Sequence, residues 1–309
     1  MRLIAILGGS GSGKSQLGLE LAQKHSCEIF SLDSLSIYQE IDIASAKPTK
    51  EELESVIHYG INVLSPTEHN NALVFDTLLK DAIAKTQSKG KDTLLIIGGS
   101  SFYLKAIIEG LSPLPKLSNE KQKEIEEQIS SLTNPLEFLL SIEPNLPFSH
   151  QDSYRIRKYL EIYFSTHLAP SLYFKQNPKI PFAYPIEKYV LILDREILRE
   201  RITLRTQKMD ELGLLDEVQR LLQKYGNEIQ PFSSIGLKEC KEYIEEKISS
   251  KEELLSLIST HTAQLAKRQS TFNRTQFGIP KEIGSCTSPR EYATEHIIQG
   301  DYASLLKSI

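Results

Sequence analysis

Short, continuous apolar runs recur along the chain, and a polar or glycine-rich turn follows most of them. The first run, residues 3–7, does not alternate between polar and apolar positions, which is typical of a strand covered by helices on both faces of a parallel sheet. We expect further strands at residues 28–32, 61–64, 93–97 and 189–193, with helical stretches between most of them. Strands that alternate with helices predict an α/β fold built on a doubly wound parallel sheet.

A glycine-rich loop directly follows the first strand. It reads Gly8, Gly9, Ser10, Gly11, Ser12, Gly13, Lys14 and Ser15, which matches the phosphate-binding pattern G-x-x-x-x-G-K-[ST] between a strand and a helix. The glycines let successive backbone N–H groups face one anion, and the helix N-terminus adds partial positive charge. We expect Lys14 to reach the phosphates and the Ser15 hydroxyl to ligate Mg²⁺. The alternative is a turn without a ligand, but every position of the pattern is matched.

Two polar residues follow predicted strands at the edge of the sheet where ligands collect. Asp33 comes after the second strand, and Ser100 comes after the fourth strand in Gly98-Gly99-Ser100. Both residues are therefore candidates for the chemistry of a site. Asp33 fits a helix N-cap or a turn equally well, and the two glycines fit a simple tight turn.

A helical segment interrupts the α/β pattern in the middle of the chain. Prolines at 113 and 115 break the pattern, a charged helical stretch follows at 118–130, and the strand pattern returns only near Lys188. We therefore expect a core domain of residues 1–115 and 187–309, with a mostly helical insertion of residues 116–186.

Charge is unevenly distributed along the chain. With 36 Lys and Arg against 40 Asp and Glu, the net charge is -4, which does not by itself indicate nucleic-acid binding. Residues 153–186 nevertheless contain five cations, one acid and eight aromatic residues, and residues 254–281 contain four cations and no acid. Cations that hold phosphates and rings that stack on bases are what single-stranded nucleic acid requires. The alternative, an aromatic core face with a solvated basic face, is favoured by composition alone.

The composition excludes several classes of protein. Hydrophobic residues make up 40% of the chain and charged residues 25%, as in ordinary globular proteins. Cys27, Cys240 and Cys286 lie far apart, so we expect neither a disulfide framework nor a structural zinc site. No apolar run approaches the roughly 20 residues of a membrane span, and the first run is too short for a signal peptide. We expect a cytoplasmic protein that does not contact a membrane.

An ordered set of short motifs extends from Gly8 to about Arg274. After the phosphate loop come Asp33-Ser34-x-x-Ile37-Tyr38, Ala46-Lys47-Pro48, His58-Tyr59-Gly60-Ile61, Gly98-Gly99-Ser100, Gly110 to Pro115, Asp152-x-x-Arg155, Arg201 to Met209, Ile235-Gly236-x-Lys238-Glu239 and Ala266-Lys267-Arg268-Gln269-x-Thr271. In this order they resemble the tRNA dimethylallyltransferases, a family of isopentenyltransferases. The resemblance covers nearly the whole chain, and it is the combination that is specific.

The resemblance implies a P-loop NTPase-like fold and a prenyl transfer. The family moves the dimethylallyl group of dimethylallyl diphosphate to N6 of adenosine 37, beside the anticodon, in tRNAs that read codons beginning with U. Diphosphate is released with the help of Mg²⁺. On this basis Asp33 is the general base, and Lys14, Arg205 and Mg²⁺ at Ser15 neutralise the diphosphate, which lies in the phosphate loop. Ser100 is expected to hydrogen-bond near the reacting groups.

The resemblance also implies contacts to the anticodon stem-loop of tRNA, from which the target adenosine must be extruded. The residues expected to contact tRNA are Asp33, Ser34, Leu35, Ser36, Ser100, Gln122, Arg155, Arg157, Lys158, Lys267 and Arg268. The sequence departs from the family pattern at Ser36 (usually Gln), Ser100 (Thr), Ser101 (Gly), Arg157-Lys158 (Arg-Ala) and Phe272-Asn273 (Trp-Phe). Apart from Ser100, which keeps the hydroxyl, these departures concern RNA contacts rather than chemistry. We expect a monomer.

Three alternatives remain to be weighed. A small-molecule or nucleoside kinase would use the same loop, but it does not explain the basic, aromatic insertion. A transferase of the same chemistry that acts on free adenine nucleotides, an adenylate isopentenyltransferase, would not need so long a carboxyl-terminal half. A non-catalytic P-loop scaffold or RNA-binding module would not need the intact Lys14-Ser15 pair and Asp33.

Overall fold

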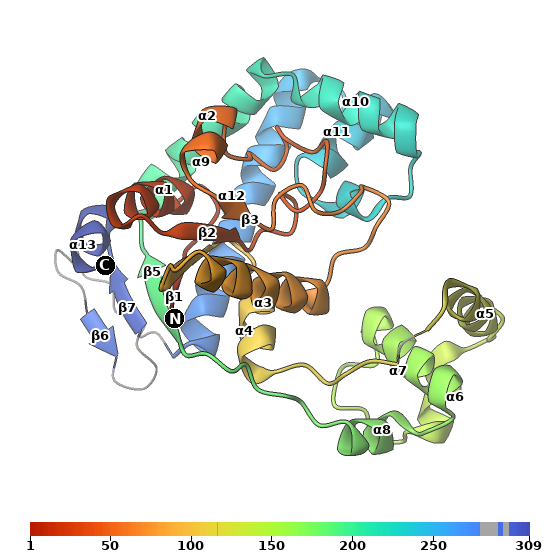
Figure 1. Cartoon of the computed structure of the whole chain (residues 1–309). Helices are drawn as coiled ribbons and strands as arrows, with labels where there is room; N and C mark the ends of the chain where they lie inside the picture. The colour runs from red at the N-terminus through yellow and green to blue at the C-terminus, as the bar shows by residue number, and fades with distance from the viewer. Residues whose placement is uncertain (116, 279–289, 293–296) are drawn as a thin grey trace. The chain divides into compact units, whose positions relative to one another are not determined.

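A twisted sheet forms the centre of the larger of two compact units (Figure 1). The computed structural model describes residues 1–115, 117–278, 290–292 and 297–309. The larger unit comprises residues 1–107 and 183–309, and the smaller unit comprises residues 108–182. Within the described residues the sheet has seven strands in the order β3-β2-β4-β1-β5-β7-β6. Only the pairing of β6 with β7 is antiparallel.

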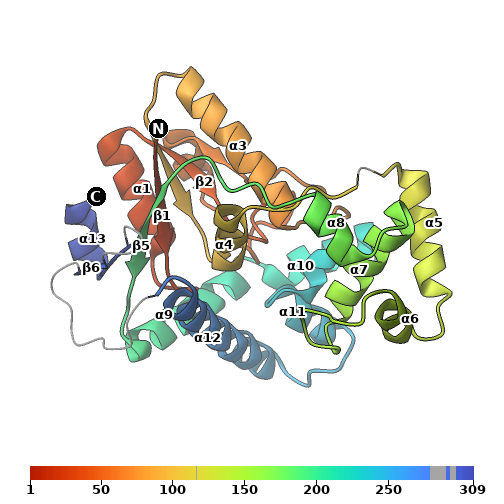
Figure 2. The same ribbon diagram turned by 90° about the horizontal axis from the view of Figure 1, so that it is seen from below.

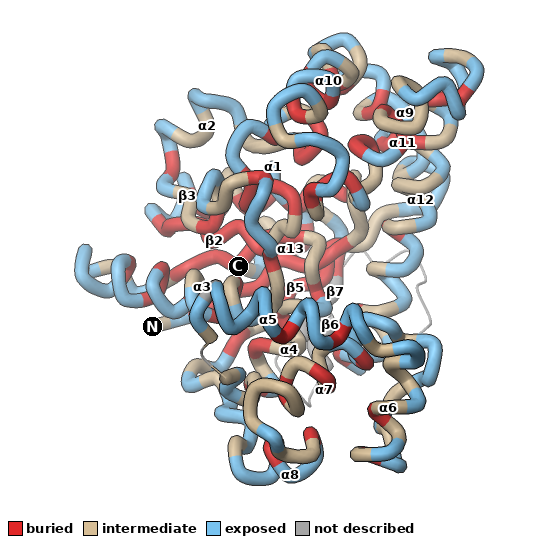
Figure 3. Tube along the Cα trace, turned by 90° about the vertical axis from the view of Figure 1, so that its right-hand side faces the viewer, coloured by how far each residue is buried: buried red, intermediate tan, exposed pale blue. Residues whose placement is uncertain are grey.

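The strands are β1 (Arg2–Leu7), β2 (Glu28–Ser31), β3 (His58–Tyr59), β4 (Thr93–Ile97), β5 (Ile186–Leu191), β6 (Arg290–Tyr292) and β7 (Ile297–Gly300). The predicted doubly wound α/β fold is confirmed. Residues 3–7 are at most 1% exposed, as expected for a strand covered on both faces. Figure 3 shows the buried residues concentrated on the strands.

The prediction of a strand at residues 61–64 is wrong, because the chain leaves the sheet one residue after β3. Gly60 adopts a φ of +77°, and a Cβ at this position would lie 2.7 Å from the carbonyl oxygen of Ser31. Beyond it, the N–H groups of Val63 and Leu64 donate to the carbonyl of Ile37 at 2.8 and 3.0 Å. The fifth strand also lies earlier than the predicted 189–193, and β6 and β7 were not anticipated.

Ten helical elements belong wholly or mainly to the α/β unit in the part of the chain that the structure describes. They are α1 (Lys14–His25), α2 (Lys50–Ser55), α3 (Ala72–Ser88), α4 (Ser101–Glu109), α9 (Arg195–Glu211), α10 (Leu214–Tyr225), the 3-10 helix η1 (Gln230–Ser233), α11 (Leu237–Ile244), α12 (Lys251–Gln276) and α13 (Tyr302–Ser308). Helices α9 and α12 pack against each other, as Figure 2 shows.

The smaller, helical unit contains α5 (Asn119–Ser130), α6 (Pro135–Ile142), α7 (Ser153–Thr166) and α8 (Pro170–Gln176) around its own apolar core. It spans residues 108–182 rather than the expected 116–186. The residues before Pro115 belong to it because Leu111 bridges to Ile180 and the Tyr173 hydroxyl donates to the carbonyl of Pro113 at 2.9 Å.

The cysteines and the apolar character of the helices can also be located in the fold. Cys27 and Cys240 are free and buried, whereas Cys286 and Lys281 lie outside the described residues. Among the helices that are described, none combines the length and the apolar character needed to cross a membrane.

Candidate active site

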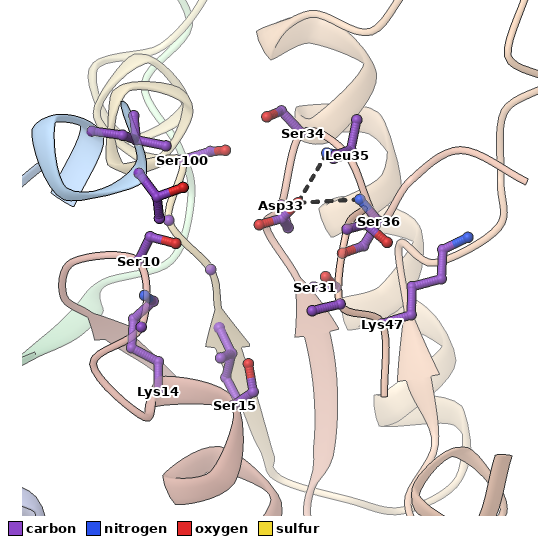
Figure 4. Close-up of a pocket in the computed structure, with 18 of the residues that line it drawn as sticks. Ser10, Lys14, Ser15, Ser31, Asp33, Ser34, Leu35, Ser36, Lys47 and Ser100 are labelled. Carbon is purple, nitrogen blue, oxygen red and sulfur yellow. Dashed lines mark hydrogen bonds between the residues drawn. The ribbon is translucent and has the colours of Figure 1, made fainter. Parts of the chain in front are cut away.

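A cavity of about 980 Å³ opens at the carboxyl ends of the central strands of the α/β unit (Figure 4). Its walls come from the phosphate loop after β1, residues 31–36 after β2, residues 97–103 after β4, and helices α9 and α12. The sequence predicted the first three segments at one edge of the sheet, and the cavity brings them together. Helix α12 contributes residues from far along the chain, since Gln269 lies 170 positions beyond Gly99.

The phosphate loop presents a row of backbone donors. Gly11 and Gly13 adopt φ values of +80° and +96°, and Gly13 is the N-cap of α1. Among the described residues, the N–H groups of Gly11, Gly13, Lys14 and Ser15 have no hydrogen-bond acceptor. Ser10, Gly11, Gly13, Lys14 and Ser15 line the cavity, whereas Gly8, Gly9 and Ser12 do not. This geometry suits an anion at the first turn of a helix.

Lys14 is buried beneath the loop. Its ammonium group donates to the carbonyl of Gly9 at 2.7 Å. Burial lowers the pKa of the Lys14 ammonium to about 8, the Asp33 carboxylate opposes this shift, and the Arg205 guanidinium adds to it. The three charged groups therefore interact electrostatically across the cavity.

Two arginines reach this end of the cavity from one face of α9, because they are four residues apart. Burial lowers the pKa of the Arg205 guanidinium, and the Asp33 carboxylate opposes that shift. Arg201 donates to the carbonyl of Ser12 in the phosphate loop at 3.4 Å. The sequence marked Arg201 by the Arg201-to-Met209 motif and by its helical spacing from Arg205, but it was not among the predicted site residues. Together with Lys14, these two arginines outnumber the Asp33 carboxylate, with which Lys14 and Arg205 interact.

Asp33 both fixes the turn after β2 and lines the cavity. Its Oδ1 accepts hydrogen bonds from the N–H groups of Leu35 at 2.9 Å and Ser36 at 3.1 Å, which fixes the turn after β2. Its Oδ2 has no hydrogen-bond partner in the described part of the chain, and Asp33 lines the cavity. Figure 4 shows Asp33 across the cavity from Ser10 and Lys14. One carboxylate oxygen thus orients the group while the other stays available.

Ser100 lies beside this turn because the two chain segments approach closely. A Cβ on Gly98 would lie 2.0 Å from the carbonyl oxygen of Leu32, so only glycine fits at this position. The Ser100 N–H donates to that same carbonyl at 3.3 Å. Ser34, Leu35, Ser36 and Ser100 all line the cavity.

Gln269 on α12 joins two of these segments and was missed as a site residue. Its Oε1 accepts from the N–H of Ser10 at 2.8 Å, and its Nε2 donates to the carbonyl of Gly99 at 2.9 Å. The side chain therefore sets the spacing between the phosphate loop and the turn that carries Ser100. It lies 259 positions from Ser10, and its only sequence signal was membership of the Ala266-to-Thr271 motif.

The remaining predicted residues fall into two groups. Arg268 lines the cavity, and Lys267 is exposed on the same helix. The other four, Gln122, Arg155, Arg157 and Lys158, belong to the helical unit. In that unit Arg155 pairs with Asp152, Arg157 pairs with Glu126 and Glu161, and Lys158 pairs with Glu161.

Comparison with known proteins gives a consistent result. Residues 36–276 match the family model described as IPP transferase. The tRNA dimethylallyltransferase of Helicobacter pylori strain J99 is 51% identical over 89% of this chain and 88% of its own length. That of Wolinella succinogenes is 50% identical over 90% of this chain and 93% of its own length.

Solved structures of similar proteins extend the comparison to the fold. A full-length tRNA isopentenylpyrophosphate transferase of Bacillus halodurans superposes with a TM-score of 0.65 and 25% identity, over 97% of this chain and 90% of that chain. A eukaryotic dimethylallyltransferase, described as acting on tRNA, superposes with a TM-score of 0.72 and 27% identity, over 88% of this chain and 70% of that chain.

Proposed function

The chain belongs to the IPP transferase family, and we propose that it transfers the dimethylallyl group of dimethylallyl diphosphate to N6 of an adenosine beside the anticodon of tRNA. The observation that carries this proposal is a single cavity that combines an anion-binding loop, a carboxylate and an apolar wall. The leaving diphosphate, the proton of N6 and the allyl group each need one of these three surfaces.

The diphosphate occupies the phosphate-loop end. The N–H groups of Gly13, Lys14 and Ser15 bind its oxygens, and the Lys14 ammonium leaves the carbonyl of Gly9 to reach them. Arg205 and Arg201 approach from α9 and neutralise the charge that grows on the leaving group. The loop recognises phosphates and not bases, so it accommodates a diphosphate ester as well as a nucleotide.

The allyl group packs on the apolar wall. Ile202 and Met209 on α9 and Ile258 on α12 line the cavity and are less than 9% exposed. A hydrocarbon group gains free energy on such a surface, at about 25 cal/mol per Å² of apolar area removed from water. The wall also excludes water from a carbon that develops positive charge as its bond to oxygen breaks.

Asp33 takes the proton in the chemical step. The N6 lone pair forms the new bond to the allyl carbon while the carbon–oxygen bond breaks and its electron pair leaves with the diphosphate. N6 is a poor nucleophile because its lone pair is delocalised into the ring. Transfer of an N6 proton to Oδ2 of Asp33 prevents positive charge from remaining on the product, and Oδ1 holds the carboxylate in place. Ser100 hydrogen-bonds beside the reacting groups.

The residues at the loop fit a magnesium ion held mainly by substrate and water. No group of three or more His, Cys, Asp or Glu that could bind a metal occurs in the described ranges. The Ser15 hydroxyl is exposed and makes no hydrogen bond to a described residue, and it is an oxygen ligand of the kind that Mg²⁺ prefers. The ion supplies positive charge to the leaving diphosphate.

Every residue proposed for the chemical step lies in one α/β unit of one chain. We therefore propose that the active form is a monomer.

A transfer experiment tests the proposal against the alternatives. The purified protein is incubated with Mg²⁺ and labelled dimethylallyl diphosphate, with unmodified tRNA or with AMP, and separately with ATP and candidate alcohols. We expect label in tRNA and in no other acceptor. Label in AMP, or phosphate transfer from ATP, without label in tRNA would replace this function with an adenylate isopentenyltransferase or a kinase.

A further inference from the structure

Phe102 is a large apolar side chain that remains exposed at the edge of the cavity. It lies on the first turn of α4, two residues after Ser100, and it is 59% exposed although it lines the cavity. Burying such a ring would ordinarily contribute about 1.5–3 kcal/mol to stability. Ile180 and Leu204 are as exposed, but Phe102 differs from them because it lines the cavity.

Contacts with other aromatic rings hold Phe102 in place. Its ring meets those of Phe272 at 6.2 Å and Tyr103 at 5.9 Å between centroids. Tyr103 stacks in turn on Phe75 at 5.1 Å, and Phe75 is fully buried. The Tyr103 hydroxyl donates to Oδ1 of Asn70 at 3.0 Å. The exposed face of Phe102 is thus anchored to the core, so a ligand that stacks on it needs to order little of the protein.

The surface next to this face is basic. From His261 to Gln276, α12 carries Lys267, Arg268 and Arg274 and no acid. None of these three cations forms an ion pair with any residue that the structure describes. An apolar surface for a protein partner does not require such unpaired cations, whereas a nucleic acid needs both rings for its bases and cations for its phosphates.

We propose that Phe102, supported by Phe272, is a stacking platform for the nucleobase next to the adenosine that enters the cavity. Extruding one base from a loop leaves its neighbour without a stacking partner on one face. A flat, immobile ring at the edge of the cavity replaces that partner, and the cations of α12 hold the adjoining phosphates. The inference rests on the proposed function and adds to it a specific contact to the RNA.

The absence of tryptophan from the whole chain makes this contact directly measurable. Phe102→Trp introduces a single indole at the platform, and Leu212→Trp introduces one at a position that is 60% exposed and does not line the cavity. Each variant is titrated with an anticodon stem-loop RNA while tryptophan emission is recorded. We expect stacking to quench the emission of Phe102→Trp and to leave that of Leu212→Trp nearly unchanged.

A second variant measures the energetic contribution. Phe102→Ala is expected to weaken binding of the stem-loop by roughly 5- to 150-fold, the range for losing one base–ring stack, and to leave the affinity for inorganic diphosphate unchanged. If emission of Phe102→Trp is indifferent to RNA and Phe102→Ala binds it as tightly as wild type, the platform does not exist. If wild type labels no tRNA at all, it is the proposed function that fails.

Discussion

Two regions of the molecule carry a local excess of cations, and they differ in whether those cations form ion pairs. On α7 of the helical unit, Arg155 pairs with Asp152 at 3.3 Å and Lys158 pairs with Glu161 at 2.6 Å. Arg157 pairs with Glu126 and with Glu161. On α12 of the α/β unit, Lys267, Arg268 and Arg274 form no ion pair with a described residue.

The difference changes how the two regions should bind RNA. A cation that already holds a carboxylate must give up that partner to bind a phosphate, and the freed acid then needs another counterion. An unpaired cation can bind a phosphate without losing a protein partner, and the counterions condensed on the RNA at that phosphate are then released into solution. We therefore expect α12 to supply more of the RNA affinity, and more of its salt dependence, than α7 does.

The aromatic residues show the contrast only in part. In the helical unit Tyr159 packs between Phe148 at 4.8 Å and Phe174 at 5.5 Å, and Phe138 stacks on Phe164 at 5.6 Å. Tyr154 on α7 is nevertheless 63% exposed, as Phe102 beside α12 is at 59%. The Lys158 ammonium, which lies over the Tyr154 ring, is already paired with Glu161, so the two exposed rings differ in whether the cations beside them are paired.

The largest expected effect separates chemistry from RNA binding. Asp33→Asn should lower the single-turnover rate by roughly 10²- to 10⁴-fold, because an amide cannot accept the N6 proton, with little change in tRNA affinity. Rapid-quench kinetics with labelled dimethylallyl diphosphate, beside a binding assay, provide the measurement. Asp81→Asn, which changes a surface pair with Lys85, is the matched control. A collapse of tRNA affinity would make Asp33 an RNA-binding residue instead.

The next effect tests the basic face of α12. Lys267→Ala combined with Arg268→Ala should weaken tRNA binding by roughly 10- to 100-fold, since two charge-assisted contacts are lost. The affinity for diphosphate alone provides the control, and it should fall less than the affinity for tRNA. Unchanged tRNA binding would remove α12 from the interface.

A smaller effect follows from the buried cation of the phosphate loop. Because the pKa of Lys14 is lowered to about 8, its charge is present below that pH and is lost as the pH rises above it. Diphosphate affinity should fall by up to about tenfold for each further pH unit, and binding there should take up a proton. Calorimetry in buffers of different ionisation enthalpy measures both quantities. The arginine of Lys14→Arg does not titrate in this range, so the diphosphate affinity of this variant should no longer depend on pH. If the affinity of the variant still falls with rising pH, the titrating group belongs to the diphosphate.

Breaking the hydrogen bond between Gln269 and Gly99 should lower kcat by about tenfold. Gln269→Glu keeps the acceptor for the Ser10 N–H but places a carboxylate oxygen against the carbonyl of Gly99. We expect kcat to fall while KM for tRNA and the unfolding temperature change little, and Gln269→Asn to be too short to restore the link. A fall in unfolding temperature that accounts for the lost activity would leave Gln269 with a structural role only.

The smallest effect belongs to the helical unit. Arg155→Ala combined with Lys158→Ala should weaken tRNA binding only a few-fold, because these cations have carboxylate partners in the free protein. The measurement is the same binding assay used for α12. An effect as large as that of the α12 variant would mean that RNA displaces the acids at little cost.

What the sequence predicted correctly was local. The phosphate loop, β1 and β4 depend on contiguous patterns, and Asp33 follows its strand as expected. The failures involve partners far along the chain, since β3 ends where Gly60 meets Ser31, and Gln269 bonds to Ser10 across 259 positions. Counting charges within residues 153–186 likewise missed Asp152 and Glu126, which lie outside that window and neutralise its cations.

The salt dependence of tRNA binding tests the central contrast most directly. The slope of log affinity against log salt is measured for wild type, for the Lys267→Ala, Arg268→Ala protein and for the Arg155→Ala, Lys158→Ala protein. The first double variant should lower the magnitude of the slope by about 1.4–1.8, the value for two phosphate contacts, and the second should lower it by well under about 1. Equal losses, or a larger loss in the helical unit, would contradict the account.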